Sequence, residues 1–164
     1  MNLISLPFLT GDFVLFLIFF LSAFFFIFIF GRVRLVLILF SIYLSFLILN
    51  IIPLKGFIIG LQSSDISILK SILFVGLTLI FFLILTRSLA AQSLKMRNEG
   101  NNFWGILLLS LTQVGLILTV ILSFFPDNSR LVLGSVSQTV FLSDISLLTW
   151  IILPIIVIFW IGKK

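Results

Sequence analysis

The sequence predicts an all-α fold: a polytopic transmembrane helix bundle with five spans. Two observations predict this class: 62% of the 164 residues are hydrophobic, and only 9% are charged. A soluble domain has about 45–50% apolar and about 25% charged residues, so this chain has too few polar groups to cover a core with a wet surface. A lipid bilayer removes that requirement and is the first partner we expect. The whole chain, 1–164, is expected to form a single membrane domain.

Five apolar runs have nearly the length that a membrane helix needs, about 20 residues for a hydrocarbon core of about 30 Å. They are 13–30, 35–52, 68–86, 103–125 and 145–161. Asp12 precedes the first run, and Pro53 and Pro126 follow the second and the fourth. Only Gly-Arg-Val-Arg separates the first two runs, which predicts a tight helical hairpin. The polar stretch 88–102 is expected to be solvated and to extend the third helix by a turn or two.

The positions of lysine and arginine predict the orientation. One set of alternate loops holds seven of the ten basic residues: Arg32, Arg34, Arg87, Lys95, Arg97, Lys163 and Lys164. The other set holds Lys55, Lys70 and Arg130, together with four of the five acids. Because basic loops stay in the cytoplasm, the N-terminus is expected outside and the C-terminus inside. The topology anchors are Arg32, Arg34, Arg87, Lys163 and Lys164, whereas Lys70 is expected to snorkel outward from the third run.

The segment 130–143, just before the last run, has a weaker helical pattern. Val132, Val136 and Val140 share one helix face, with Leu133 beside them, and most of the polar residues lie elsewhere. This pattern predicts a helix that lies in the membrane interface. An irregular loop is the alternative.

The sequence carries little chemistry. It contains no His and no Cys, and its five runs have no ionisable residue at mid-depth. We therefore expect no catalytic residue, no metal ligand and no cofactor, and the chain is not expected to be an enzyme. An enzyme for lipid-linked substrates would have to use the loop residues Asp127, Asn128, Arg130 and Asp144. The basic residues flank apolar runs instead of forming a stripe among aromatics, so no nucleic acid partner is expected.

Small and neutral polar residues recur within the runs. The fourth run has Gly105, Thr112, Gly115 and Thr119 on one seam, with Gln113 and Ser110 on the neighbouring face, and the second run has Ser41 and Ser45. Such residues let helix backbones approach closely and hydrogen-bond between helices, so helix packing is the expected role; Gly76 and Thr78 suggest the same for the third run. The alternative is an oligomeric channel or facilitator with a polar path along Gln113, Thr112 and Asn50.

Pro154 interrupts the last run. Proline removes one helical hydrogen bond and is expected to kink this helix. Thr149 lies one turn earlier and is expected to help satisfy the freed carbonyl.

A set of short motifs resembles the colicin V production protein family. The first span runs through the basic turn Gly31-Arg32-Val33-Arg34 into the second, and Phe103-Trp104-Gly105 opens a small-residue-rich span that ends Ser123-Phe124-Phe125-Pro126. The chain departs from the family in lacking a Gly just after the basic turn and an Asp near the start of the last shared span, and in having a fifth run. The resemblance covers roughly residues 12–130 and implies a non-enzymatic bacterial inner-membrane protein linked to secretion or envelope homeostasis.

Together these features predict a small non-enzymatic integral membrane protein that acts by helix–helix contacts. We expect a scaffold or a subunit of a membrane assembly, as a homo-oligomer or with other membrane subunits, in the cell membrane. Its expected location is the bacterial inner membrane.

The orientation is testable with a reporter at each end of the chain. We expect an N-terminal tag to be accessible from outside the cell and a C-terminal tag to be accessible only after permeabilisation, because the arginine-rich turns stay inside. Finding both tags on the same side would exclude an odd number of spans.

Overall fold

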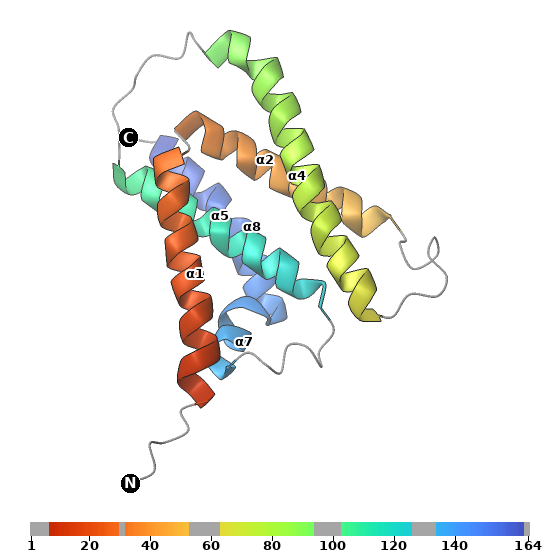
Figure 1. Cartoon of the computed structure of the whole chain (residues 1–164). Helices are drawn as coiled ribbons and strands as arrows, with labels where there is room; N and C mark the ends of the chain where they lie inside the picture. The colour runs from red at the N-terminus through yellow and green to blue at the C-terminus, as the bar shows by residue number, and fades with distance from the viewer. Residues whose placement is uncertain (1–6, 30–31, 53–62, 94–102, 126–133, 163–164) are drawn as a thin grey trace.

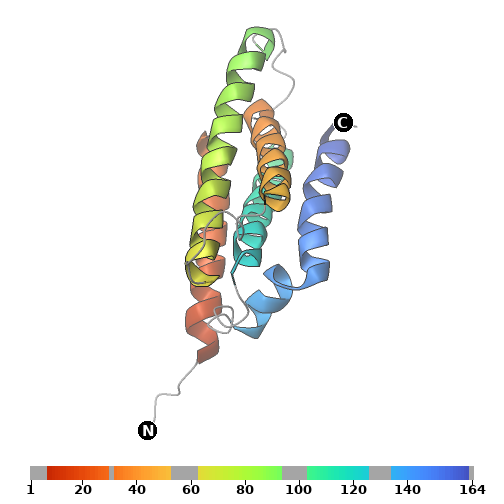
Figure 2. The same ribbon diagram turned by 90° about the vertical axis from the view of Figure 1, so that its right-hand side faces the viewer.

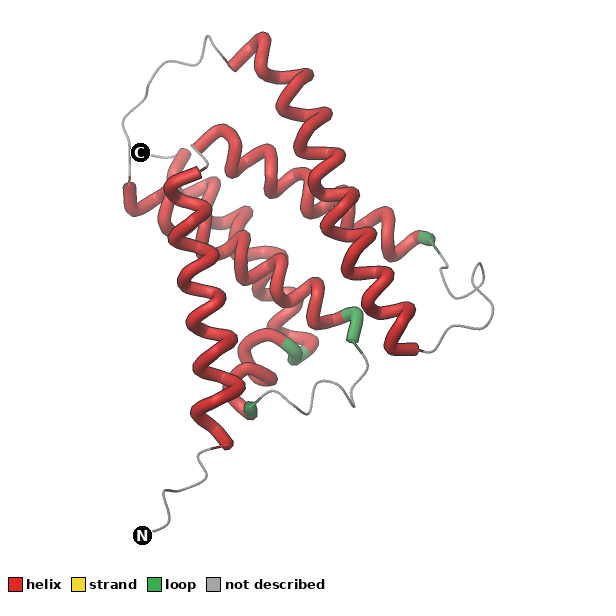
Figure 3. Tube along the Cα trace, in the orientation of Figure 1, coloured by secondary structure: helices red, strands yellow, loops and turns green. Residues whose placement is uncertain are grey.

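The structure, a computed structural model, describes residues 7–29, 32–52, 63–93, 103–125 and 134–162. These residues form the helices α1 (Pro7–Ile29), α2 (Arg32–Ile51), α4 (Ser63–Ser93), α5 (Phe103–Ser123), α7 (Ser135–Phe141) and α8 (Asp144–Gly162). Figure 3 shows no strand in this part of the chain. The predicted all-α class is therefore confirmed.

Four of these helices, α1, α2, α4 and α5, are each long and apolar enough to cross a membrane. α7 and α8 meet the same criterion together and are bent by 54° at the break between them. The chain is thus a multi-pass helical membrane protein with four spans, or five if the bent pair forms one span. The five predicted runs agree with this count.

The helices extend beyond the apolar runs most at the beginning of α1 and at the end of α4. α1 begins at Pro7, so Asp12 lies inside the helix and is buried, whereas the sequence placed it before the span. Proline is well suited to the first helical position, where its missing N–H is not needed. α4 continues to Ser93, about two turns past Thr86, because Leu, Ala and Gln favour helix after the apolar run has ended.

The central helix is α5, which packs against α1 and α8 and also touches α2 and α7. α4 packs mainly along α2, so that it reaches α5 near one end only. Figures 1 and 2 show the result, with α4 and α8 on opposite sides of the α2–α5 pair. Over half of the α5 span is buried (56%), against 6% of the α4 span. The fold is therefore built around α5 and leaves α4 outermost.

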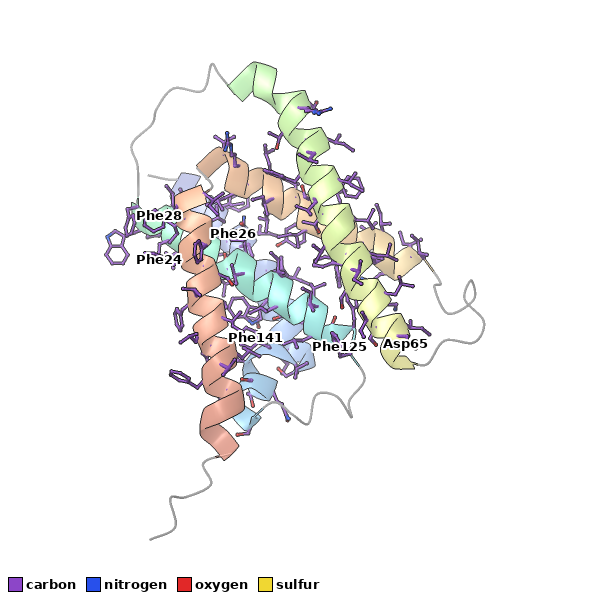
Figure 4. All side chains as sticks on the ribbon, in the orientation of Figure 1. Phe24, Phe26, Phe28, Asp65, Phe125 and Phe141 are labelled. Atoms are coloured by element: carbon purple, nitrogen blue, oxygen red, sulfur yellow. The ribbon has the colours of Figure 1, made fainter. Side chains whose placement is uncertain are left out.

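The described helix ends separate the charges. The beginning of α2, the end of α4 and the end of α8 lie at the upper end in Figure 1, whereas the beginnings of α1 and α4 lie at the lower end. Exposed Arg34, near the beginning of α2, and exposed Arg87, near the end of α4, belong to the upper group. Asp12 of α1 and Asp65 of α4, which Figure 4 labels, belong to the lower group, where Lys70 of α4 also lies. The predicted anchors Lys163 and Lys164 lie outside the described residues. Which end faces the cytoplasm stays a prediction.

Lys70 lies on α4 and is half-buried. Its Nζ is 5.9 Å from the centroid of the Phe124 ring, just past the end of α5. This distance permits a cation–π interaction. The ammonium group therefore lies beside the end of α5, and its expected snorkelling toward the membrane surface stays a prediction.

The apolar core is shared by the helices and is not divided into layers. Leu116 and Val120 of α5 pack with residues of α2 and with Phe74 of α4. Closer to the opposite end, Leu35 of α2 meets Leu109 of α5 and residues of α8. The side chains of α1 divide between the two environments: Phe26 packs against the core, whereas Phe24 and Phe28 are exposed (Figure 4).

Two glycines of α5 let α8 come close. A Cβ atom added at Gly115 would lie 2.0 Å from Cζ3 of Trp150, and one added at Gly105 would lie 3.0 Å from Cγ1 of Ile161. Gly76 of α4 is different, because a Cβ atom there would meet nothing within 4 Å. The fold requires that residue 115 has no side chain, whereas the space around Gly76 would accept one.

Gly115→Ala is expected to lower the free energy of unfolding by about 1–3 kcal/mol, because the Trp150 ring must move or the helices must separate. The matched control, Gly76→Ala, is expected to be neutral or stabilising by up to about 1 kcal/mol, since alanine is the better helix former. Denaturation in detergent micelles, followed by the helical circular dichroism signal, measures both. Equal effects of the two variants would contradict the packing at Gly115.

Candidate functional site

The described residues contain few groups that could carry chemistry. No group of three or more His, Cys, Asp or Glu side chains in this part of the chain could hold a metal ion. The candidate site is therefore the set of neutral polar side chains between the helices.

Gln113 is completely buried on α5 and connects this helix to α2. Its Nε2 donates a hydrogen bond to the backbone oxygen of Leu35 at 2.5 Å, across 78 residues of sequence. Its Oε1 is buried and accepts no hydrogen bond, and the hydroxyls of Ser110 and Thr119 on the same helix are also unbonded. Gln113 thus makes the hydrogen bond to another helix that its position suggested, but it is enclosed by protein on every side.

Tyr43 makes a second long-range connection, from α2 to α8. Its hydroxyl donates to the backbone oxygen of Ile151 at 2.5 Å. Ile151 lies one turn before Pro154, where the helix has lost one N–H donor. Because the acceptor lies next to this gap, Tyr43 attaches α2 to the turn of α8 that lacks one helical hydrogen bond.

The role expected for Thr149 is wrong. Its hydroxyl donates to the oxygen of Ile145, four residues back, and the side chain is exposed. The carbonyl that Pro154 leaves without its helical donor is that of Trp150, four residues before the proline. A threonine hydroxyl reaches back toward the N-terminal turn, so Thr149 cannot serve a carbonyl that follows it.

The other predicted packing residues lie inside the bundle. Ser41, Ser45, Gly105, Thr112, Gly115 and Thr119 are all buried. The hydroxyls of Ser41 and Ser45 bond to the oxygens four residues back, at 2.8 and 2.7 Å, and that of Thr112 bonds to Leu109 at 2.9 Å. The hydroxyls of Ser41, Ser45 and Thr112 are therefore satisfied within their own helices, whereas the buried hydroxyl of Thr119 has no hydrogen bond.

The residues expected to line a polar path are not brought together within one chain. Gln113 and Thr112 are buried, but Asn50 is exposed near the other end of α2. Asn50 is 15 residues from Leu35, the partner of Gln113, or about 22 Å along the helix. A path formed between several chains stays a prediction.

The segment before the last span contains α7, so the helix predicted there is confirmed for Ser135–Phe141. Its buried residues are Ser137 and Phe141, whereas Val136 is exposed. Part of the predicted valine face thus points away from the bundle. Val132 and Leu133 lie outside the described residues, and a location of α7 in the membrane interface stays a prediction.

An aromatic cluster holds α7 against α1 and α8. The rings of Phe141 and Trp150 are stacked, with centroids 5.7 Å apart and 10° between their planes, and Phe19 meets both rings edge-on. Nε1 of Trp150 donates to the oxygen of Val140 at 2.9 Å. This is also the ring that lies on Gly115.

Sequence reasoning missed the contact between Asp12 and α7. The backbone N–H of Ser137 donates to Oδ1 of Asp12 at 3.3 Å. These residues are 125 positions apart, and no local pattern pairs them. The sequence offers one signal, an acid beside a long apolar run, and this pattern is equally typical of a helix boundary.

The chain matches no family model, no curated protein and no solved structure. The resemblance to the colicin V production protein family therefore stays an expectation.

Tyr43→Phe is expected to lower the free energy of unfolding by about 0.5–1.5 kcal/mol, because the Ile151 oxygen loses its side-chain donor. Thr149→Val is the matched control, since it removes an exposed hydroxyl that bonds within its own helix, and it should change stability by less than about 0.5 kcal/mol. Denaturation of each variant in the same detergent measures the difference. A Tyr43→Phe protein as stable as the wild type would show that this bond contributes nothing.

Proposed function

We propose that this membrane protein is a non-enzymatic scaffold or subunit of a membrane assembly, and that it binds its partners through α4. The observation that carries the proposal is the 6% buried share of the α4 span. A helix that contributes so little to the core of its own chain is the one most available to another chain.

The exposed side of α4 extends along the whole span. Its large apolar side chains include Ile72, Val75, Leu79, Ile80, Leu83 and Ile84. Lipid also covers such a surface, so apolar exposure alone does not distinguish lipid from protein. Membrane helices associate mainly by close packing, which requires a small residue where the backbones meet.

Gly76 supplies that small residue. It lies in the middle of the α4 span, and no atom of its own chain approaches within 4 Å of where its Cβ would be. Glycine in a helix interior destabilises by about 1 kcal/mol relative to alanine. A contact with a second chain would explain a glycine that the monomer does not need.

The interior supports a contact role over chemistry. The buried polar side chains of α2 and α5 bond to backbone oxygens or are enclosed, as Gln113 is. Gln113 connects two helices, the hydroxyls of Ser41 and Ser45 bond within α2, and none of these three groups lies at the surface of its chain. We place the protein in the bacterial inner membrane and its assembly in secretion or envelope homeostasis, because the resemblance of the basic hairpin turn and the fourth span implies this setting.

The test uses purified protein, labelled with donor and acceptor dyes in separate batches, in liposomes at low protein density. Energy transfer above the level for random encounters is expected, and Gly76→Leu should reduce it severalfold because the added side chain separates the helices. Gly76→Leu should leave the stability of the single chain unchanged, whereas Phe24→Leu on the exposed side of α1 should leave the association unchanged.

Random-level transfer in the wild type, together with no cross-linked partner in native membranes, would exclude the proposal. Association that Gly76→Leu does not weaken would exclude α4 as the contact helix.

A further inference from the structure

Two arginines and two tryptophans lie at one end of the described helices. Arg34 is in the first turn of α2, Arg87 is less than two turns before the end of α4, and both are exposed. Trp104, in the first turn of α5, is 71% exposed, and Trp160, in the last turn of α8, is 48% exposed. All four helix ends belong to the upper end of the bundle in Figure 1. Indole rings prefer the level of the lipid headgroups, which therefore is also the level of the two arginines.

The acids of the described helices lie at the opposite end. Asp65 is in the first turn of α4, Asp144 is the first residue of α8, and Asp12 lies in the first half of α1. None of these three carboxylates is therefore placed to neutralise Arg34 or Arg87. The abundant anion at the level of the headgroups is the phosphate of a phospholipid. A guanidinium group matches phosphate well, because it donates two parallel hydrogen bonds to its oxygens.

The surface of α4 next to Arg87 suits the rest of a lipid molecule. Leu83 and Ile84 lie one turn closer to the middle of the span, on the same side of the helix as Arg87. They are exposed by 58% and 55%. The helix thus presents a cation and then apolar side chains, in the order in which a phospholipid presents a phosphate and then acyl chains. A free anion would gain nothing from the apolar part of this surface.

We propose that this end of the bundle binds anionic phospholipid, with Arg34 and Arg87 as the residues that bind the headgroup phosphates. An anionic headgroup is preferred to phosphatidylcholine, because the choline cation offsets the charge of its own phosphate. A basic side chain near an anionic lipid surface contributes about a fivefold preference. The inference goes beyond the protein contact proposed at Gly76, since Arg87 is 11 residues, or about 16 Å, further along α4.

The test is native mass spectrometry of the full chain, purified in detergent, with phosphatidylglycerol and phosphatidylcholine added in equal amounts. The measurement is the ratio of the two lipids that the protein retains. A ratio of about five or more in favour of phosphatidylglycerol is expected for the wild type. The double variant Arg34→Gln/Arg87→Gln should bring this ratio to about one, because it removes both proposed phosphate ligands.

The matched control is Lys55→Gln/Arg130→Gln, which removes the same number of charges from the other set of loops. It should keep the wild-type ratio, since the net charge falls equally while Arg34 and Arg87 stay. Arg34→Lys/Arg87→Lys keeps the charges and should give a ratio well above that of the glutamine pair. Inorganic phosphate added to the wild-type sample should leave the lipid bound, because it cannot replace the contacts of the acyl chains.

Equal retention of the two lipids by the wild type would overturn the proposal, and so would a wild-type ratio in Arg34→Gln/Arg87→Gln. An equal loss in Lys55→Gln/Arg130→Gln would show a response to net charge alone. Displacement of the lipid by inorganic phosphate would identify a free anion as the ligand and would also overturn it. Helical circular dichroism identifies any variant that has lost its fold, and the lysine pair, which keeps both charges, then decides between charge and shape.

Discussion

The indole ring of Trp150 is the point where α1, α5, α7 and α8 meet, and its position depends on Gly115 having no side chain. The ring lies on the α5 backbone, stacks on Phe141 of α7 and meets Phe19 of α1 edge-on. Its N–H is bonded to the oxygen of Val140, so the donor of the ring itself is paired. Membrane helices gain little from excluding water, so such close packing and paired polar groups are what hold them together.

α2 and α4 are joined to this group by a different means. Gln113 connects α5 to the beginning of α2, and Tyr43 connects the middle of α2 to α8, each through a backbone oxygen. A backbone acceptor needs no matching side chain, so one polar residue is enough to make each connection. Apolar packing around Leu116 and Phe74 then includes α4 in the same core. In the described part of the chain, α2 and α4 thus share an apolar core with the other helices, and Gln113 and Tyr43 add hydrogen bonds between helices.

Much of the fold could be predicted from sequence because hydrocarbon thickness sets the length of each apolar run. The small residues of α5 could likewise be placed inside the bundle, since a seven-three-four spacing puts them on one face. The partners of these residues could not be predicted. Nothing near Gly115 in the sequence indicates Trp150, and nothing near Asp12 indicates Ser137, because both contacts form between helices far apart in the chain. The Thr149 prediction failed for a local reason, the direction in which a helical hydroxyl points.

The length of α4 has a mechanical consequence. Its 31 residues make a rod of about 46 Å, longer than the hydrocarbon core of about 30 Å. The helix is thus about 16 Å longer than the hydrocarbon core, and the turns from Arg87 to Ser93 continue it beyond the apolar run. A 10° change in the tilt of such a rod displaces its far end by about 8 Å relative to its near end.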